Sequence, residues 1–150
     1  MLGTLAKWLR IFGFDTFYAN AEISDEELLH IAKKENRVVV TRDRLLLQRG
    51  RKEDLQVIET NSTDLDEQLR HVLNLKDAEI DEDAFLSRCL VCNTNLEEIS
   101  KKDVKAKVPE KVFINNEKFW LCPTCNKIYW TGSHTDKMIK KINKIKKSHN

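Results

Sequence analysis

Two Cys-x-x-Cys pairs constrain the fold of this chain more than any other feature of its sequence. Cys89 and Cys92 form the first pair, and Cys122 and Cys125 form the second. A Cys-x-x-Cys turn directs two thiolates toward one point, and residues 93–121 can form a β-hairpin that brings the two turns together. The spacing predicts zinc held by four thiolates. Two disulfides are the alternative, which we disfavour because no secretory signal indicates an oxidising compartment.

A zinc ion with four protein thiolates has no open position for a substrate water. We therefore expect a structural rather than a catalytic metal. It would stabilise a small lobe with little core of its own, because apparent zinc-binding energies of roughly 10 kcal/mol or more become folding energy in such lobes.

Composition and charge indicate one ordinary soluble domain with a small appendage. The chain is 41% hydrophobic and 33% charged, and no apolar run is long enough to span a membrane, so we expect a cytoplasmic location. Residues 1–88 are net acidic and residues 89–150 are net basic. Six lysines between Lys137 and Lys147 indicate either a solvated helix face or contact with nucleic acid.

Helical and strand patterns alternate through the first half of the chain. Gly13 suits a left-handed helix cap, Ser24 begins a capping box with Glu27, and Gly50 is expected to end a short helix. The expected helices cover residues 1–12, 25–34, 45–48 and 65–75, and the expected strands cover residues 16–19, 37–41 and 55–60. This order, αβαβαβα, predicts an α/β layer fold whose parallel sheet gathers functional groups at the carboxyl ends of its strands.

Two acidic residues follow expected strands, where an α/β fold gathers its functional groups. Asp43 directly follows the expected strand at residues 37–41, and Asp25 opens a helix. Magnesium takes oxygen ligands, often one or two carboxylates completed by water and phosphate, which suits phosphodiester cleavage. Each residue also has a structural interpretation, since carboxylates in the first turn of a helix favour its dipole and Asp is a common N-cap.

Short motifs lie at residues 1–10, 24–29, 40–44, 122–130 and 132–134. Taken together and in this order, they resemble the Mut-seven C-terminal ribonuclease domain family nearly from end to end. The resemblance implies a variant of the PIN nuclease fold, with a parallel sheet and acids that bind magnesium or manganese for RNA cleavage, followed by a zinc ribbon. It also implies that Asp25 and Asp43 are metal ligands. Arg42 and Arg44 then become candidates for phosphate contact, although a structural ion pair is the equal alternative.

The chain departs from the family pattern at its beginning. PIN-like domains start with a strand that ends in an acid, whereas this sequence enters its first helix at Met1, which provides no N-cap. We interpret Met1 as an internal methionine downstream of the real start, with a degraded family member as the alternative. If these residues are the whole protein, we expect catalysis to be impaired because the first acid is absent.

The basic half supplies the remaining candidate residues. Phe119, Trp120, Tyr129 and Trp130 flank the second Cys pair; at least two of them should pack around the zinc, and one could stack on a base. A final helix should begin after Thr135 as its N-cap, with Met138, Ile139, Ile142 and Ile145 on its apolar side. Its lysines would attract RNA without selecting a sequence. The candidate RNA-binding residues here are His134, for which a structural hydrogen bond is the first alternative, Lys140, Lys141 and Lys144.

The sequence thus predicts a PIN-like lobe over residues 1–88, a zinc ribbon over residues 89–134 and a basic helix over residues 135–150. We expect a ribonuclease dependent on magnesium or manganese. The alternative is a non-catalytic RNA-binding module that uses the ribbon and the basic helix. The RNA substrate, the choice between endonuclease and exonuclease action, and the oligomeric state stay open.

Overall fold

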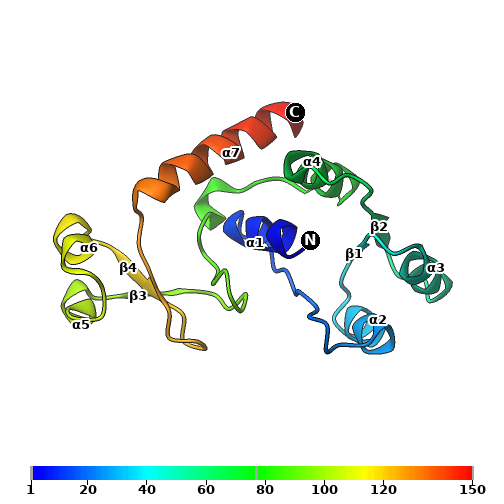
Figure 1. The fold of residues 1–150 in the computed structure, drawn as a ribbon, viewed down its shortest axis with the longest axis horizontal. Helices are drawn as coiled ribbons and strands as arrows, with labels where there is room; N and C mark the ends of the chain where they lie inside the picture. Colours follow the sequence, from blue (N-terminus) through cyan, green and yellow to red (C-terminus); the bar gives the residue numbers. More distant parts are fainter. Residues whose placement is uncertain (1, 77, 150) are drawn as a thin grey trace. The chain divides into compact units, whose positions relative to one another are not determined.

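The computed structural model describes residues 2–76 and 78–149, without the side chains of Glu82, Ser133, His134 and residues 147–149. The chain forms two compact units (Figure 1). Unit 1 contains residues up to Ala6 together with Phe17–Glu79, and unit 2 contains Lys7–Thr16 and Ile80–Ser148. Helix α1, Leu2–Ile11, therefore begins in unit 1 and ends in unit 2. The predicted boundaries after residues 88 and 134 stay predictions.

A pair of parallel strands forms the centre of unit 1. Strand β1, Val39–Thr41, pairs with β2, Val57–Glu59, so that Thr41 lies opposite Glu59 at the carboxyl ends. Both strands are shorter than the sequence predicts. The parallel pairing with flanking helices confirms the predicted α/β class.

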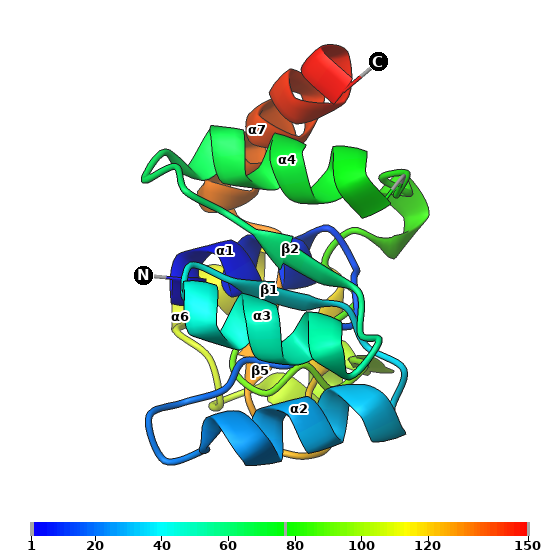
Figure 2. The same cartoon turned by 90° about the vertical axis from the view of Figure 1, so that its right-hand side faces the viewer.

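Three helices flank this pair. They are α2, Asp25–Lys34, α3, Arg44–Lys52, and α4, Leu65–Lys76. In Figure 2, α2 lies on the β1 side of the strand pair and α4 lies on the β2 side. Leu29, Ala32, Val39 and Leu46 are buried together between α2, β1 and α3. The predicted capping box of α2 is present, since the Ser24 hydroxyl accepts from the Glu27 N–H and the Glu27 carboxylate accepts from the Ser24 N–H.

Two predictions about the first half of the chain are wrong. Residues 12–24 contain no strand, because the Thr16 N–H donates to the Asn93 side chain at 3.0 Å instead of to a neighbouring strand. Helix α3 also continues past Gly50, which is buried in its last turns. A Cβ atom at Gly50 would lie 2.6 Å from the Val57 side chain, so this glycine permits close packing of α3 on β2 and does not end the helix.

Unit 2 is built around a small antiparallel sheet in the order β3-β4-β5. The strands are β3, Glu97–Ile99, β4, Phe119–Leu121, and β5, Ile128–Tyr129. In Figure 1 the chain leaves β3, forms the short helices α5, Lys101–Val104, and α6, Glu110–Asn115, and returns along β4. The predicted hairpin between the cysteine pairs is confirmed, but the two helices in its loop were missed. A 3-10 turn, η1 at Glu82–Ala84, precedes the sheet.

Gly13 ends α1 as predicted. Its φ of 96° is left-handed, and its N–H donates to the Arg10 carbonyl at 3.0 Å. A Cβ atom here would lie 2.5 Å from the carbonyl oxygen of Ala84 in the η1 turn. Both the backbone conformation and this close approach therefore require glycine.

The last helix, α7, covers Ser133–His149. It begins before Thr135, whose predicted role as N-cap is therefore wrong; its hydroxyl instead accepts from the Gly132 N–H. Ile142 and Ile145 are buried as the apolar pattern predicts, whereas Ile139 is 44% exposed. Within the described residues, no helix combines the length and the apolar character needed to cross a membrane.

Candidate metal centre and carboxylate positions

The four cysteines converge on one point of unit 2. Their Sγ atoms all lie within 4.8 Å of one another, with Cys89 3.5 Å from Cys125 and Cys92 3.4 Å from Cys122. Tetrahedral zinc with Zn–S bonds of about 2.3 Å requires sulfur atoms about 3.8 Å apart. All four cysteines are free, so the disulfide alternative is not what the chain forms. The donor set and its spacing fit zinc, and four thiolates leave no open coordination position.

Each cysteine pair is held by the same backbone turn. We call residues 89–93 the first knuckle and residues 122–126 the second knuckle. Each ends in an asparagine in the left-handed region, Asn93 with φ 72° and Asn126 with φ 63°. Each asparagine N–H donates to the carbonyl of the first cysteine in its knuckle, at 2.9 Å in both cases. Asparagine tolerates this conformation better than most residues, so it makes the tight turn possible.

Two arginines contact the first knuckle. Arg10, in the last turn of α1, donates through Nη1 to the carbonyls of Leu90 at 2.9 Å and Val91 at 3.2 Å. Arg88 donates to the carbonyl of Asn93 at 2.9 Å. Residues far apart in sequence are thereby joined around this turn.

Tyr129 lies beside the Cys89 thiol. Its Oη is 3.1 Å from the Cys89 Sγ and accepts from the Leu90 N–H at 3.0 Å, which leaves its own proton for the sulfur. Burial raises the pKa of Cys89, but hydrogen bonds from Tyr129 and from the N–H groups of Cys92 and Val91 outweigh this effect and lower the pKa to about 6. Burial, together with the same contact to Cys89, raises the pKa of Tyr129. Cys89 is therefore prepared to bind metal as a thiolate.

The second knuckle is more open. Cys122 is buried but Cys125 is exposed. The Lys127 N–H lowers the pKa of Cys125, but partial desolvation and the neighbouring thiols raise it by more, to about 11. Besides the contacts between the cysteines, a 3.0 Å hydrogen bond joins the hydroxyl of Thr94, directly after the first knuckle, to that of Thr124 in the second.

Asp43 lies at the carboxyl end of β1, where the fold predicts a functional group. Its carboxylate accepts from the Leu45 N–H at 2.8 Å and so caps α3, while its own N–H donates to the Thr41 hydroxyl. The structural interpretation of Asp43 as an N-cap is confirmed. Its exposed side chain leaves further carboxylate lone pairs for a ligand.

Asp25 is the first residue of α2, and its side chain is half exposed. A carboxylate oxygen of Asp25 lies 3.9 Å from Nη1 of Arg49 on α3, and Glu26 lies 3.8 Å from the same guanidinium. Among the described residues, the four cysteines are the one group of three or more potential ligands within reach of a single ion. The metal-binding roles of Asp25 and Asp43 therefore stay predictions.

The predicted phosphate-binding arginines flank Asp43. Arg42 is half-buried. Arg44 is largely exposed, with Nε 3.6 Å from the Glu59 carboxylate at the end of β2, as the ion-pair alternative anticipates. Such an exposed pair contributes little stability. Glu59 was not singled out by sequence, although its place at the end of an expected strand was the available signal.

The predicted RNA-binding residues of α7 are only partly described. Lys140 and Lys144 are exposed, and the Lys141 ammonium lies 5.2 Å from the Trp8 ring centroid. The side chain of His134 lies outside the described residues. Of the aromatic residues near the second knuckle, Phe119 is fully buried.

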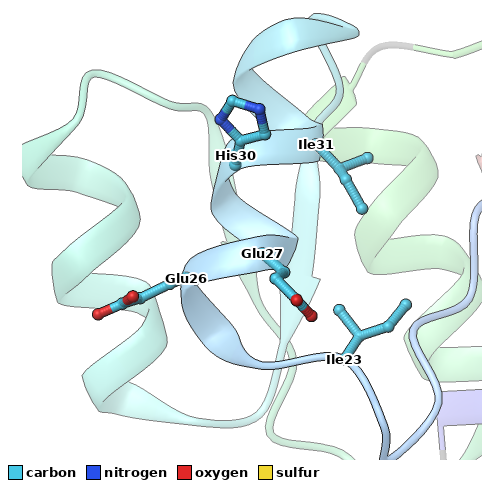
Figure 3. Close-up of a pocket in the computed structure, with 5 residues that line it drawn as sticks. All are labelled: Ile23, Glu26, Glu27, His30 and Ile31. Carbon is cyan, nitrogen blue, oxygen red and sulfur yellow. The ribbon is translucent and has the colours of Figure 1, made fainter.

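A shallow, open pocket lies along α2 in unit 1. It is lined by Ile23, Glu26, Glu27, His30 and Ile31, with Glu27 and Ile31 pointing to the same side of the helix (Figure 3). The Glu27 carboxylate is already used in the capping box. Glu26 lies 3.8 Å from the Arg49 guanidinium, and the pocket opens to solvent, so nothing in it points to a catalytic site.

Sequence reasoning missed the residues around the metal centre. Asn93, Asn126 and Arg10 had no assigned role, and Tyr129 was considered only for packing around the zinc or for stacking on a base. A signal existed for the asparagines, because one follows each Cys-x-x-Cys pair directly. No local signal existed for Arg10, which lies 80 positions from its partner.

Comparison with known proteins gives a match to a protein family. The model of the Mut7-C RNAse domain family matches residues 1–142. No curated protein and no solved structure matches the chain. Nearly the whole sequence is covered by the family model, including both cysteine pairs, Asp25 and Asp43. The chain therefore belongs to the Mut7-C RNAse domain family.

Proposed function

We propose that this chain is a ribonuclease that depends on magnesium or manganese. The observation that carries the proposal is the match to an RNase domain family over residues 1–142. The position of Asp43 supports it, because carboxyl ends of parallel strands are where α/β folds place their functional groups.

Asp25 and Asp43 would bind the catalytic ion through their carboxylates. When bound, magnesium or manganese supplies activation of a water for attack on the phosphodiester. The cap from Asp43 to Leu45 holds one carboxylate oxygen in place, which fixes the orientation of the other. Arg49 would orient Asp25 in the same way.

Arg42 and Arg44 would bind the RNA phosphates beside Asp43. Arg44 is well suited to exchange partners, since its contact with Glu59 is long and exposed. A guanidinium can bind a phosphate through two parallel hydrogen bonds. In unit 2, Lys140, Lys141, Lys144 and His134 would add contacts to phosphates that do not depend on sequence. Zinc at the four cysteines would be structural.

A non-catalytic RNA-binding module is the second candidate. It is favoured by the protein contacts that both carboxylates already make, the N-cap of Asp43 and the ion pair of Asp25. In this case the ribbon and the lysines of α7 would hold RNA, and the acids would only stabilise helices.

Cleavage of labelled single-stranded and hairpin RNA, with and without manganese, separates the two candidates. Asp43→Asn is the sharpest variant, because asparagine caps a helix about as well as aspartate but is a poor metal ligand. Asp64→Asn is the matched control, since Asp64 accepts from the Glu67 N–H at the start of α4 in a similar manner.

A nuclease loses cleavage without manganese and in Asp43→Asn, and keeps it in Asp64→Asn. RNA binding that weakens with salt, without cleavage and unaffected by Asp43→Asn, supports the binding module instead. Cleavage that survives both Asp43→Asn and metal removal contradicts the proposed mechanism.

A further inference from the structure

Arg10 is a buried cation whose hydrogen bonds are directed at the metal centre. Only 8% of the residue is exposed. Its Nη1 donates to the carbonyls of Leu90 and Val91, the two residues between the first cysteine pair, and its Nε donates to the Thr16 carbonyl at 2.9 Å. The guanidinium thus contacts the turn that presents Cys89 and Cys92.

The charge of the metal centre explains why a cation is placed here. Four thiolates around a zinc ion carry a net charge of −2, which is costly to bury without compensation. Burial lowers the pKa of Arg10, whereas the Cys89 and Cys92 thiolates raise it, with smaller contributions from Tyr129 and Asp15. An arginine stays protonated in such a site and offsets part of the negative charge.

The helix dipole alone does not account for Arg10. A cation in the last turn of a helix is favourable anywhere on the helix surface, and usually stays in solvent. Arg10 instead loses most of its hydration and gains three carbonyl partners outside α1. Lys7, one turn earlier on the same helix, is exposed.

The segment after Arg10 is tied to the same knuckle. The Asn93 side chain accepts from the Thr16 N–H at 3.0 Å and donates to the Asp15 carboxylate at 2.6 Å. Arg88 donates to the Gly13 carbonyl as well as to that of Asn93. Residues 10–16 and the first knuckle therefore form one hydrogen-bonded unit.

We propose that Arg10 is a positioning residue of the zinc centre, which fixes the first knuckle and offsets its charge, so that zinc binding and the ordering of residues 10–16 stabilise each other. Reciprocity is required of any such coupling. If the ordered segment favours zinc, then zinc favours the ordered segment by the same factor.

Zinc affinity of the full chain, measured by competition with a chromogenic chelator, tests the proposal. We expect Arg10→Met to bind zinc about 10- to 100-fold more weakly, the usual effect of losing a group that supports metal ligands. Arg10→Lys keeps the charge without the planar fork and should fall between Arg10→Met and the unchanged protein. Lys7→Met removes a cation from the same helix and should bind zinc unchanged.

Cobalt substitution and thermal unfolding complete the test. The absorption of a tetrahedral cobalt–thiolate centre should persist in every variant, which shows that the four ligands still assemble. Saturating zinc should raise the unfolding temperature by less in Arg10→Met than in Lys7→Met. If Arg10→Met does not fold, Arg10→Lys decides the matter. Affinities of the Arg10 variants equal to that of Lys7→Met overturn the proposal.

Discussion

The two knuckles share one backbone conformation but differ in what surrounds them. Both end in a left-handed asparagine and close with the same backbone hydrogen bond. The first knuckle is contacted by Arg10, Arg88 and Tyr129, whereas the second places Cys125 at the surface. A short motif thus determines where the sulfur atoms point. The rest of the chain determines how firmly each pair is held.

Removal of zinc should have the largest effect. It also tests whether the first knuckle stays better held than the second when the metal is gone. Treatment with a strong chelator should unfold the β3-β4-β5 sheet, because structural zinc contributes roughly 10 kcal/mol or more to such lobes. Tryptophan fluorescence and circular dichroism would follow the change, since Trp120 lies in β4. Added zinc should restore both signals. An unchanged spectrum after verified metal loss would show that the protein contacts alone hold the sheet.

Exchange of one ligand at a time compares the knuckles directly. Cys89→Ser should bind zinc at least about tenfold more weakly than Cys125→Ser, because Cys89 is buried among hydrogen-bond donors that support its thiolate. Cys125 is exposed, so water can replace its sulfur with little rearrangement. The measurement is chelator competition on both variants. Equal losses would mean that the protein surroundings contribute nothing to ligand strength.

Substitution of the two asparagines compares the two knuckles at a similar cost in backbone strain. Both Asn93→Ala and Asn126→Ala place alanine in the left-handed region, at a similar cost of about 1–2 kcal/mol. Asn93→Ala also loses the contacts to Thr16 and Asp15, so its free energy of unfolding should fall by a further 1–2 kcal/mol or so. Chemical denaturation with zinc present measures the difference. Identical values would indicate that the segment before residue 17 is not held through Asn93.

The smallest expected effects come from single hydroxyl groups. Tyr129→Phe should cost about 1 kcal/mol, because it leaves the Leu90 N–H without its partner and removes a donor from Cys89. Thr124→Ala loses one exposed hydrogen bond and should change stability by less than about 0.5 kcal/mol. Thermal unfolding of the two variants in parallel gives the ranking. A larger loss in Thr124→Ala would reverse the assignment of the first knuckle as the better supported one.

Helix caps and tight turns could be predicted from the sequence, because the residues that form them are neighbours both in the chain and in space. The capping box of Ser24 and Glu27, the cap at Gly13 and the Cys-x-x-Cys turns each involve residues a few positions apart, and all were predicted correctly. The helices in the loop between β3 and β4 were missed because the segment was interpreted only as a hairpin.

Features that depend on distant residues could not be predicted in this way. The expected strand at residues 16–19 has a suitable composition, but its Thr16 N–H is taken by a side chain of the first knuckle. Gly50 has the sequence appearance of a helix end, yet the nearby Val57 side chain explains it. The role of Arg10 likewise depends on carbonyls that only the folded chain brings close. For the acids, the sequence correctly predicted that Asp43 follows β1 and could cap the next helix.

The reach of Arg10 across 80 positions has a consequence for synthesis of the protein. On a ribosome that adds about 5–20 residues per second, α1 emerges roughly 4–16 seconds before the carbonyls that it contacts. The thiols of the second knuckle follow later still. Until Leu90 and Val91 are made, the end of α1 has no partner in the first knuckle, and a ribbon produced from residue 89 onward would never acquire that partner. Folding of the cysteine-rich lobe is therefore completed only after synthesis has moved about 80 residues beyond a segment on which it depends.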